Sequence, residues 1–317
     1  MMDLLCAYSL PLLVLAAVLL DQLLGEPRRF HPLVGLGNFA RRVEDLCYPS
    51  HTKSASRLYS QGMAAVCLVI APFVLLAVWL QTLQVVGVFF PIVVLYFCIA
   101  PRSLREHAER VWLALQAREL VAARTAVSMM VSRDTTQLDE RAVAKATVES
   151  VLENGNDAIF AALFWFVVAG APGVVLYRIS NTLDAMWGYR NARYQYFGWA
   201  AARLDDWLNF IPARLTALSY ALLGKTSSAL RCWRTQAPLW DSPNAGPVMA
   251  AGAGALQVQL GGAARYCGVE ETRPLLGGGE AVGAADIRRA CALVQRVLWV
   301  WLGLIFVASS VWEVAHA

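Results

Sequence analysis

Residues Leu58–Pro101 read LYSQGMAAVCLVIAPFVLLAVWLQTLQVVGVFFPIVVLYFCIAP, a run of 44 positions without one charged side chain. An α-helix rises about 1.5 Å per residue, so this run would reach roughly 66 Å, about twice the ~30 Å hydrocarbon core of a bilayer. The buried core of a soluble protein rarely needs so long an unbroken apolar stretch. The run therefore predicts two membrane spans that are joined by a tight turn near Gln81–Gln84.

The composition of the whole chain agrees with this prediction. Its 317 residues are 58% hydrophobic and 16% charged, with a net charge of +4 and a mean hydropathy of +0.48. Soluble domains carry about 25% charged residues, and disordered chains are far less apolar. The small net charge argues against nucleic-acid binding. We expect an all-α, integral membrane helical bundle, a single domain over residues 1–317, with four or five transmembrane helices and cytoplasmic helical loops.

Other apolar segments are candidates for the remaining spans. Leu4–Leu24 is one, and it lacks the basic start and the cleavage site of a signal peptide. Val297–Trp312 is a shorter final span. Ala158–Tyr177 is free of charge but is interrupted by Gly170-Ala171-Pro172-Gly173, so it either crosses or enters and turns back. Phe210–Gly224 is amphipathic and is expected to be interfacial or buried.

Lys and Arg in the loops predict the orientation. Since the four Arg of residues 178–203 disfavour placing that stretch outside, we favour a re-entrant arrangement of Ala158–Tyr177 over a full crossing. Residues 102–157 are then cytoplasmic and mostly helical. The protein is expected in the cytoplasmic (inner) membrane, with its active site on the cytoplasmic face. We also place the loop after the first span in the cytoplasm, because it contains six cationic residues: Arg28, Arg29, Arg41, Arg42, Lys53 and Arg57.

Polar islands separate the apolar segments. The first is Gly25-Glu26-Pro27 followed by His31-Pro32, which either only ends one helix and starts another or places His31 against an anionic ligand. In the second, Lys145, Glu149, Glu153 and Asp157 are spaced by four residues and would share one helix face. That stripe is either a solvated face with a Lys–Glu pair or a Mg²⁺ site, because Mg²⁺ prefers carboxylate and phosphate oxygens.

The third and fourth islands lie further along the chain. In the third, Asn181, Asp184 and Gly188 recur at about one helical turn, and the adjacent acids Asp205-Asp206 follow Arg203. Acidic pairs are common on surfaces, but this one directly precedes a membrane-bound segment, which favours a functional role. In the fourth, Ser242-Pro243-Asn244 precedes a run of small residues, which suggests a tightly packed helix. Free amides at such a helix start could also bind phosphate oxygens.

The islands contain short motifs whose order and spacing are more specific than any one of them. They are Arg133-Asp134-Thr135-Thr136-Gln137-Leu138, Val148-Glu149-Ser150-Val151 with Glu153-Asn154, Asn181-Thr182-Leu183-Asp184-Ala185-Met186 with Gly188-Tyr189, Ala202-Arg203-Leu204-Asp205-Asp206, Ser242-Pro243-Asn244-Ala245-Gly246 and Gln259-Leu260-Gly261-Gly262. Together they resemble the adenosylcobinamide-phosphate synthase (CobD/CbiB) family of cobalamin biosynthesis over nearly the whole chain. The chain departs from the family at Pro247-Val248-Met249, where the family often has Trp-Pro-Glu.

The resemblance implies an ATP- and Mg²⁺-dependent amide ligation. The family joins a propionate of adenosylcobyric acid to the amine of (R)-1-aminopropan-2-ol phosphate. A carboxylate is a poor acyl donor because its leaving group would be oxide, so it must first be activated, for which an acyl phosphate is the expected form. Activation needs Mg²⁺ on the ATP phosphates and cations against the developing charge. It also needs a group that accepts the proton of the ammonium.

The resemblance also assigns candidate residues. Arg190 and Arg203 would clamp phosphates. The metal ligands are expected among Glu149, Asp184 and Asp205. The wider set of catalytic carboxylates is Glu149, Asp157, Asp184, Asp205 and Asp206. The residues that would orient substrates are His31, Asp134, Asn154, Asn181, Tyr189 and Asn244. We expect these clusters to converge at one water-facing pocket beside the lipid.

Other functions compete with this interpretation. A Mg²⁺-dependent membrane prenyl- or phospho-alcohol transferase would show paired D-x-x-x-D motifs, for which we find no convincing case. A transporter would place ionisable residues inside its spans, and Leu58–Pro101 has none. A regulatory sensor of the same family would have lost most acidic islands, which persist here. The expected partners are the lipid bilayer and the two substrates, and either a second copy of the chain or other corrinoid-pathway enzymes.

Overall fold

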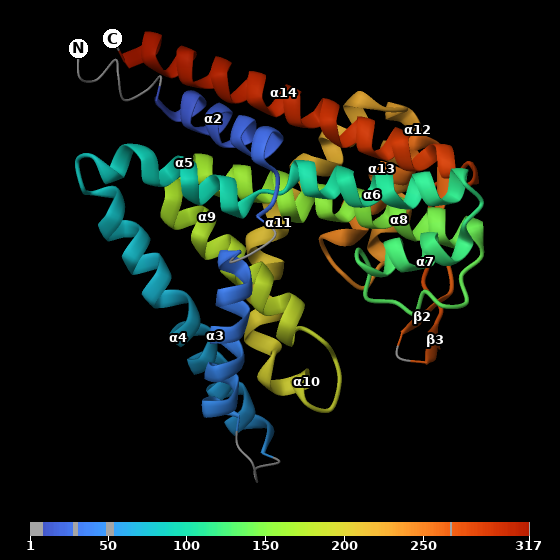
Figure 1. The fold of residues 1–317 in the computed structure, drawn as a ribbon, viewed down its shortest axis with the longest axis horizontal. Coiled ribbons are helices and arrows are strands. Elements are labelled where there is room, and N and C mark those ends of the chain that lie inside the picture. Colours follow the sequence, from blue (N-terminus) through green and yellow to red (C-terminus); the bar gives the residue numbers. More distant parts are fainter. Residues whose placement is uncertain (1–8, 28–30, 49–53, 267, 317) are drawn as a thin grey trace. The chain divides into compact units, whose positions relative to one another are not determined.

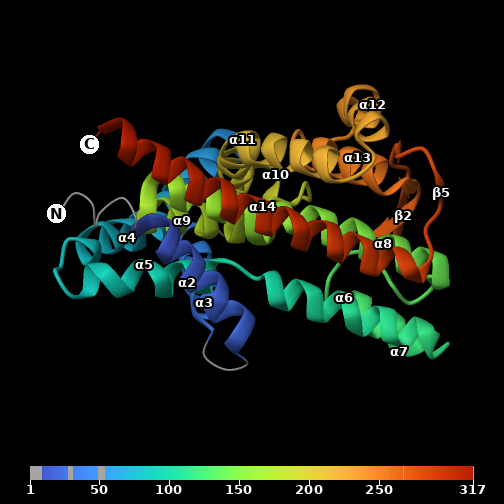
Figure 2. The same ribbon diagram turned by 90° about the horizontal axis from the view of Figure 1, so that it is seen from above.

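The computed structural model describes residues 9–27, 31–48, 54–266 and 268–316, and most of these residues are helical (Figure 1, Figure 2). The helices are α2 (Ser9–Leu24), α3 (Pro32–Cys47), α4 (Ala55–Gln81), α5 (Val86–Cys98), α6 (Pro101–Gln116), α7 (Leu120–Ser128), α8 (Glu140–Gly155), η1 (Asn156–Phe160), α9 (Ala161–Trp187), α10 (Tyr194–Phe197), α11 (Trp199–Leu223), α12 (Thr226–Gln236), η2 (Ala237–Leu239), α13 (Ala245–Leu256) and α14 (Ala284–His316). The strands, which we did not predict, are short: β1 (Val258–Gly261), β2 (Ala264–Tyr266), β3 (Val269–Glu271), β4 (Leu275–Leu276) and β5 (Glu280–Ala281).

The prediction of an all-α membrane bundle is confirmed. Within the described residues, four helical segments are long and apolar enough to cross a membrane: Ala55–Gln81, Val86–Gln116, Glu140–Trp187 and Ala284–Ala315. The turn predicted near Gln81–Gln84 falls between α4 and α5. The first predicted span contains α2, a shorter apolar helix of 16 residues that is not among these four, so its crossing stays a prediction. Residues 4–8 of that span lie outside the described residues, as do Arg28, Arg29 and Lys53.

The chain forms two compact units. Unit 1 contains residues 1–100, 161–209 and 305–317, and unit 2 contains residues 101–160 and 210–304. Neither unit is continuous in sequence, because the chain enters each of them more than once. Both units contain candidate functional residues, and the single membrane-embedded domain stays a prediction.

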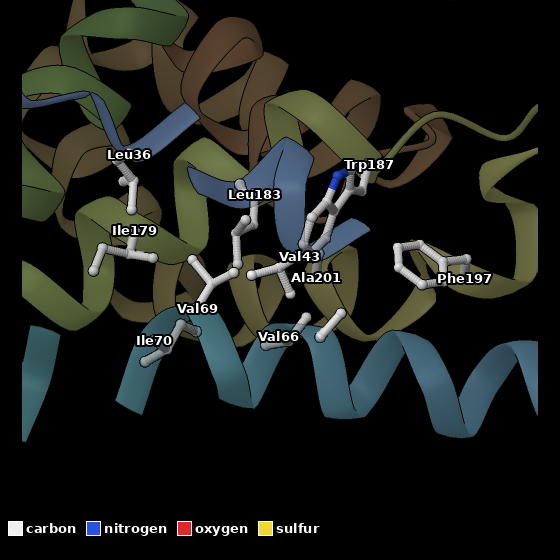
Figure 3. Packing of buried hydrophobic residues seen from close by; sticks show 12 residues of the cluster. Leu36, Val43, Val66, Val69, Ile70, Ile179, Leu183, Trp187, Phe197 and Ala201 are labelled. Atoms are coloured by element: carbon white, nitrogen blue, oxygen red, sulfur yellow. The ribbon is translucent and has the colours of Figure 1, made fainter. Parts of the chain in front are cut away.

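The core of unit 1 is built from α3, α4, α9 and α11 (Figure 3). On α9, Ile179, Leu183 and Trp187 follow one another at four-residue intervals and therefore lie on one helix face. They pack with apolar side chains of α4, including Val66 and Val69. Because this face of α9 packs into the core, the opposite face of the same part of the helix points away from the core. The polar residues of the third island lie on that opposite face.

Helix α9 is not one straight helix. Ala169 and Gly170 have non-helical backbone angles, and Gly170 has a φ of 61°. A Cβ at Gly173 would lie 2.5 Å from the carbonyl oxygen of Trp165, eight residues earlier. Eight residues of a straight helix would span about 12 Å, so the helix is sharply kinked here. The re-entrant arrangement of Ala158–Tyr177 stays a prediction, since Glu140–Trp187 as a whole is long and apolar enough to cross.

Unit 2 is centred on α8 and α13. Every residue of α13 from Gly246 to Leu256 is buried, and a Cβ at Gly254 would lie 2.6 Å from Cα of Ala229 in α12. The small residues therefore allow close helix packing, as predicted. The chain then forms β1, which pairs antiparallel with β4 and parallel with β5, while β2 and β3 form an antiparallel pair. Predicted segment Phe210–Gly224 forms the second part of α11.

Candidate functional site

Three carboxylates of unit 1 come together, and we call Asp184, Asp205 and Asp206 the acidic group. Asp184 projects from the last part of α9, and the other two lie in the first half of α11. Asp184 interacts electrostatically with both Asp205 and Asp206. Since like charges repel at short range, such an arrangement favours a bound cation. We expected Glu149 to join Asp184 and Asp205 in one pocket. Asp184 and Asp205 lie together in unit 1, whereas Glu149 belongs to unit 2, so the convergence of all three stays a prediction.

Two amides orient the central carboxylate of this group. The side-chain amide of Asn181 donates to Oδ1 of Asp205 at 3.3 Å, and that of Asn209 donates to Oδ2 at 3.1 Å. Asn209 in turn accepts a hydrogen bond at 3.2 Å from the hydroxyl of Tyr177. Asn209 was not among our candidate residues, although its position four residues after Asp205 places both on one helix face.

Two arginines modulate the acidic group. Nη1 of Arg203 lies 3.6 Å from Oδ2 of Asp206, and Arg190 also interacts with this carboxylate. Burial nevertheless raises the pKa of Asp206 above its usual range, against the effect of both arginines. The two arginines therefore compensate the negative charge of this carboxylate only in part.

Gly188 is fitted against Asp184. Its amide donates to the backbone carbonyl of Asp184 at 2.7 Å, and a Cβ at this position would overlap Oδ1 of the Asp184 side chain. Any larger residue would therefore push the carboxylate out of its present position. Gly188 is thus a part of the site that the spacing Asn181, Asp184, Gly188 had already indicated.

A second cluster lies in unit 2, and we call Arg133, Glu149 and Arg273 the Glu149 cluster. Glu149 is 1% exposed. Its Oε2 accepts hydrogen bonds from Arg133 and, at 3.3 Å, from Nη2 of Arg273. Its Oε1 accepts from the backbone amide of Gly261 at 2.7 Å. Because two guanidinium cations already pair with this carboxylate and would repel a metal ion, this arrangement does not favour the expected role of Glu149 as a metal ligand.

The loop after β1 brings further cationic groups to the Glu149 cluster. Nζ of Lys145 donates to the carbonyl of Gly261 at 2.7 Å, and Nε of Arg273 donates to the carbonyl of Gly262 at 3.2 Å. Gly261 and Gly262 have φ angles of 75° and 77°, which glycine adopts without steric cost. The guanidinium of Arg273 also lies 5.4 Å from the ring centroid of Trp240. We therefore find three cations around one buried carboxylate.

The arginines of this cluster were not among our candidate residues. Arg133 opens the first of the motifs that carry the family resemblance, and this was the available signal for it. The predicted stripe is interrupted, because the π-helix η1 begins at Asn156 and ends the α-helical spacing before Asp157. Oδ1 of Asp157 accepts a hydrogen bond from the side chain of Asn156 at 2.8 Å.

The remaining predicted residues of unit 2 make local or loop contacts. Oδ2 of Asp134 accepts from the amide of Gly268 at 2.8 Å, which links it to the β2–β3 hairpin. The side chain of Asn154 donates to the carbonyl of Ser150 at 2.9 Å. Oδ1 of Asn244 accepts from Arg214 at 2.9 Å. These three residues are therefore held in place, and their role in orienting substrates stays a prediction.

In unit 1, His31 caps α3. Its Nδ1 accepts a hydrogen bond from the amide of Leu33 at 3.2 Å, and its Nε2 lies 3.6 Å from Glu26. Burial lowers the pKa of His31 below its usual value, so the neutral ring is favoured near pH 7 and its use against an anion stays a prediction. Tyr189 and Arg190 are exposed.

The acidic group has the donor chemistry that Mg²⁺ requires. Among the described residues, no three His, Cys, Asp or Glu side chains are arranged to hold a metal ion by themselves. Mg²⁺ usually takes one or two carboxylates and completes its shell with water and substrate phosphates. Asp184, which is partly buried, and Asp205, whose oxygens are oriented by two side-chain amides, fit such a partial ligand set.

Comparison with known proteins identifies similar chains over nearly the whole length. The sequence model of one family, described as CobD/Cbib protein, matches residues 14–294. A protein of Chromobacterium violaceum named cobalamin biosynthesis protein CobD is 56% identical over 303 residues, which is 95% of this chain and 97% of that protein. The protein of the same name from Stutzerimonas stutzeri is 60% identical over 93% of this chain and 96% of its own length. The Mycobacterium tuberculosis protein of that name is 38% identical over 90% and 91%. No solved structure matches the chain.

Proposed function

We propose that this chain, which belongs to the CobD/CbiB family of cobalamin biosynthesis proteins, is an adenosylcobinamide-phosphate synthase. It would join a propionate of adenosylcobyric acid to the amine of (R)-1-aminopropan-2-ol phosphate, in an ATP- and Mg²⁺-dependent amide ligation at the inner membrane. The acidic group is the observation that carries this proposal, because three neighbouring carboxylates suit a reaction on phosphates that needs a divalent cation.

The proposed chemistry has two steps. In the first, a propionate oxygen attacks the γ-phosphorus of ATP, the bond from that phosphorus to the bridging oxygen breaks, and ADP leaves with an acyl phosphate formed. In the second, the amine nitrogen attacks the acyl carbon, the bond to the phosphate oxygen breaks, and the proton that the nitrogen loses on forming the amide leaves with inorganic phosphate. The proton of the ammonium passes to a carboxylate of the protein before this attack.

The acidic group would hold the cation. Asp184 and Asp205 are the proposed Mg²⁺ ligands, and the amides of Asn181 and Asn209 orient Asp205 for this role. When bound, Mg²⁺ would neutralise phosphate charge and polarise the phosphoryl oxygens. Asp206, whose carboxylate is raised in pKa by burial, would accept the proton of the ammonium more readily than an ordinary surface carboxylate.

The Glu149 cluster would bind phosphate charge. Arg133, Arg273 and Lys145 supply three cations near the amides of the loop after β1. Nε of Arg133 is buried and has no hydrogen-bond partner among the described residues. Glu149 would then act as a positioning residue that holds the two arginines, while Arg190 and Arg203 stay candidates for a second phosphate contact.

The direct test is a reaction with purified protein in detergent. The mixture contains ATP, Mg²⁺, the corrinoid acid and the amino-alcohol phosphate, and mass spectrometry and an ADP assay follow the products. We expect one amide and one ADP per turnover, and neither product when EDTA replaces Mg²⁺. Release of AMP and diphosphate in place of ADP would instead indicate activation as an acyl adenylate and would contradict the acyl phosphate.

The same assay also decides the alternative of a regulatory relative. That alternative draws on Met249, which is buried in α13 where the family often has a carboxylate. Corrinoid binding without turnover, at any Mg²⁺ concentration, would contradict the synthase and support the sensor. Amide formation would show that the missing carboxylate is not required.

Replacing Gly188 by alanine tests the geometry of the acidic group. The added Cβ overlaps Oδ1 of Asp184, so we expect the Mg²⁺ concentration for half-maximal ligation to rise by about 10- to 100-fold. Gly35→Ala is the matched control, because a Cβ at Gly35 meets nothing within 4 Å. An unchanged Mg²⁺ dependence in Gly188→Ala would show that Asp184 is not a Mg²⁺ ligand.

A further inference from the structure

Unit 1 contains an apolar cavity of about 250 Å³ that none of the roles above uses. It is bounded by residues of α3, α4, α5 and α9, among them Phe73, Leu76 and Val94. Of the residues that line it, Arg178 is the one with a charged side chain. The cavity is partly open and almost entirely apolar, which suits it to hold an apolar ligand.

Arg178 gives the cavity a polar end. Its Nε is buried and has no hydrogen-bond partner among the described residues, and its Nη1 makes only a long contact of 3.4 Å to Asn181. Arg178 also lines a neighbouring polar pocket, whose walls include Asp21, Glu26 and His31. A ligand that follows the cavity to this end would therefore meet one cation and then two carboxylates.

The surroundings of the cavity favour hydrocarbon. Helices α4 and α5, which form two of its walls, belong to segments that are long and apolar enough to cross a membrane. Leu76 of the wall is itself 47% exposed, so the cavity adjoins a surface that would face lipid. An engineered apolar cavity of about 150 Å³ already binds a small aromatic hydrocarbon, and this one is larger and partly open.

We propose that the cavity binds one acyl chain of a zwitterionic aminophospholipid, whose phosphate contacts Arg178 and whose ammonium faces Asp21 and Glu26. The phosphate supplies the charge that complements Arg178. The ammonium complements the two carboxylates, which would repel a headgroup of net negative charge. This site goes beyond the proposed ligation, because it does not depend on any step of that reaction.

Cavity-filling variants test the acyl-chain contact. Protein purified in mild detergent is washed extensively, and bound lipid is measured by native mass spectrometry. We expect wild type to retain one aminophospholipid per chain. Ala77→Phe and Val94→Phe each add a ring to the cavity wall and should lower the retained lipid by about 10-fold. The matched controls Leu75→Phe and Val93→Phe, at exposed positions of the same two helices, should retain it.

Arg178→Gln tests the headgroup contact without filling the cavity. Three probes compete in detergent micelles: phosphatidylethanolamine, phosphatidylglycerol and diacylglycerol. Because hydrogen bonds to a charged group are strong, wild type should bind phosphatidylethanolamine about 10-fold more tightly than the other two, and the variant should not distinguish it from diacylglycerol. This competition experiment tests the proposal even if a cavity-filling variant fails to fold.

Three results would overturn the proposal. The first is undiminished lipid in folded filling variants, or an equal loss in the controls. The second is binding of phosphatidylglycerol at least as tight as that of phosphatidylethanolamine. The third is displacement of the lipid by millimolar aminopropanol phosphate, which would make the polar end of the cavity a pocket for that small molecule.

Discussion

Glu149→Ala is expected to destabilise the protein by about 3–5 kcal/mol, which is the cost of leaving buried cations without their partner. Glu149 lies within 3.3 Å of Nη2 of Arg273 and also pairs with Arg133, while its other oxygen accepts from the amide of Gly261. Without the carboxylate, two guanidinium groups that are largely buried would repel each other. The thermal unfolding midpoint of detergent-purified protein should fall by about 10 °C.

A control and a double variant identify the cause of that loss. Glu140→Ala removes an exposed carboxylate from the first turn of the same helix and should change stability by less than about 0.5 kcal/mol. Adding Arg273→Met to Glu149→Ala removes one of the repelling cations and should recover part of the stability, which a double-mutant cycle measures. A stable Glu149→Ala protein would show that Glu149 is free to act as a ligand instead.

Asp205→Asn is expected to lower kcat/KM of the proposed ligation by at least about 100-fold, because it removes the charge of a proposed Mg²⁺ ligand. In wild type, the side-chain amides of Asn181 and Asn209 each donate to one oxygen of the Asp205 carboxylate. In the variant, the new side-chain amide would face these two amide donors. Ligation kinetics at several Mg²⁺ concentrations measure the effect.

The Asp205→Asn experiment needs a parallel stability measurement. We expect its unfolding midpoint to stay within about 3 °C of wild type, since Asp205 is only partly buried. Asp45→Asn, at an exposed position in the same unit, is the matched control and should keep full activity. Turnover close to that of wild type in Asp205→Asn would refute its assignment. A large fall in the midpoint would mean that Asp205 is structural.

Local sequence patterns predicted the elements that depend on local physics. The charge-free run gave α4 and α5 with a turn at the expected place, because apolar length and the absence of charge are properties of the segment alone. The motif Gly170-Ala171-Pro172-Gly173 indicated the interruption that appears as a kink in α9, since glycine and proline act on their own backbone. Helical spacing likewise placed Asp184 beside Gly188.

The stripe on α8 shows where a local rule fails. Four-residue spacing predicted that Asp157 would continue the face of Glu149 and Glu153, but a π-helical turn begins at Asn156. Hydrogen bonds around that turn come from elsewhere in unit 2, since Thr216 donates to the side chain of Asn156 at 2.9 Å. Packing against another segment therefore overrode the α-helical period.

By itself, the sequence determined the membrane class, the family, the long helices and the identity of most acidic residues, because composition, periodicity and motif order can be read from neighbouring positions. Only the tertiary structure decided what Glu149 does, since its partners Gly261 and Arg273 are 112 and 124 residues away. Contacts at such separations depend on how helices and strands pack, and no local pattern encodes them. The same holds for the apolar cavity beside Arg178, whose walls come from four helices distributed over the first 179 residues.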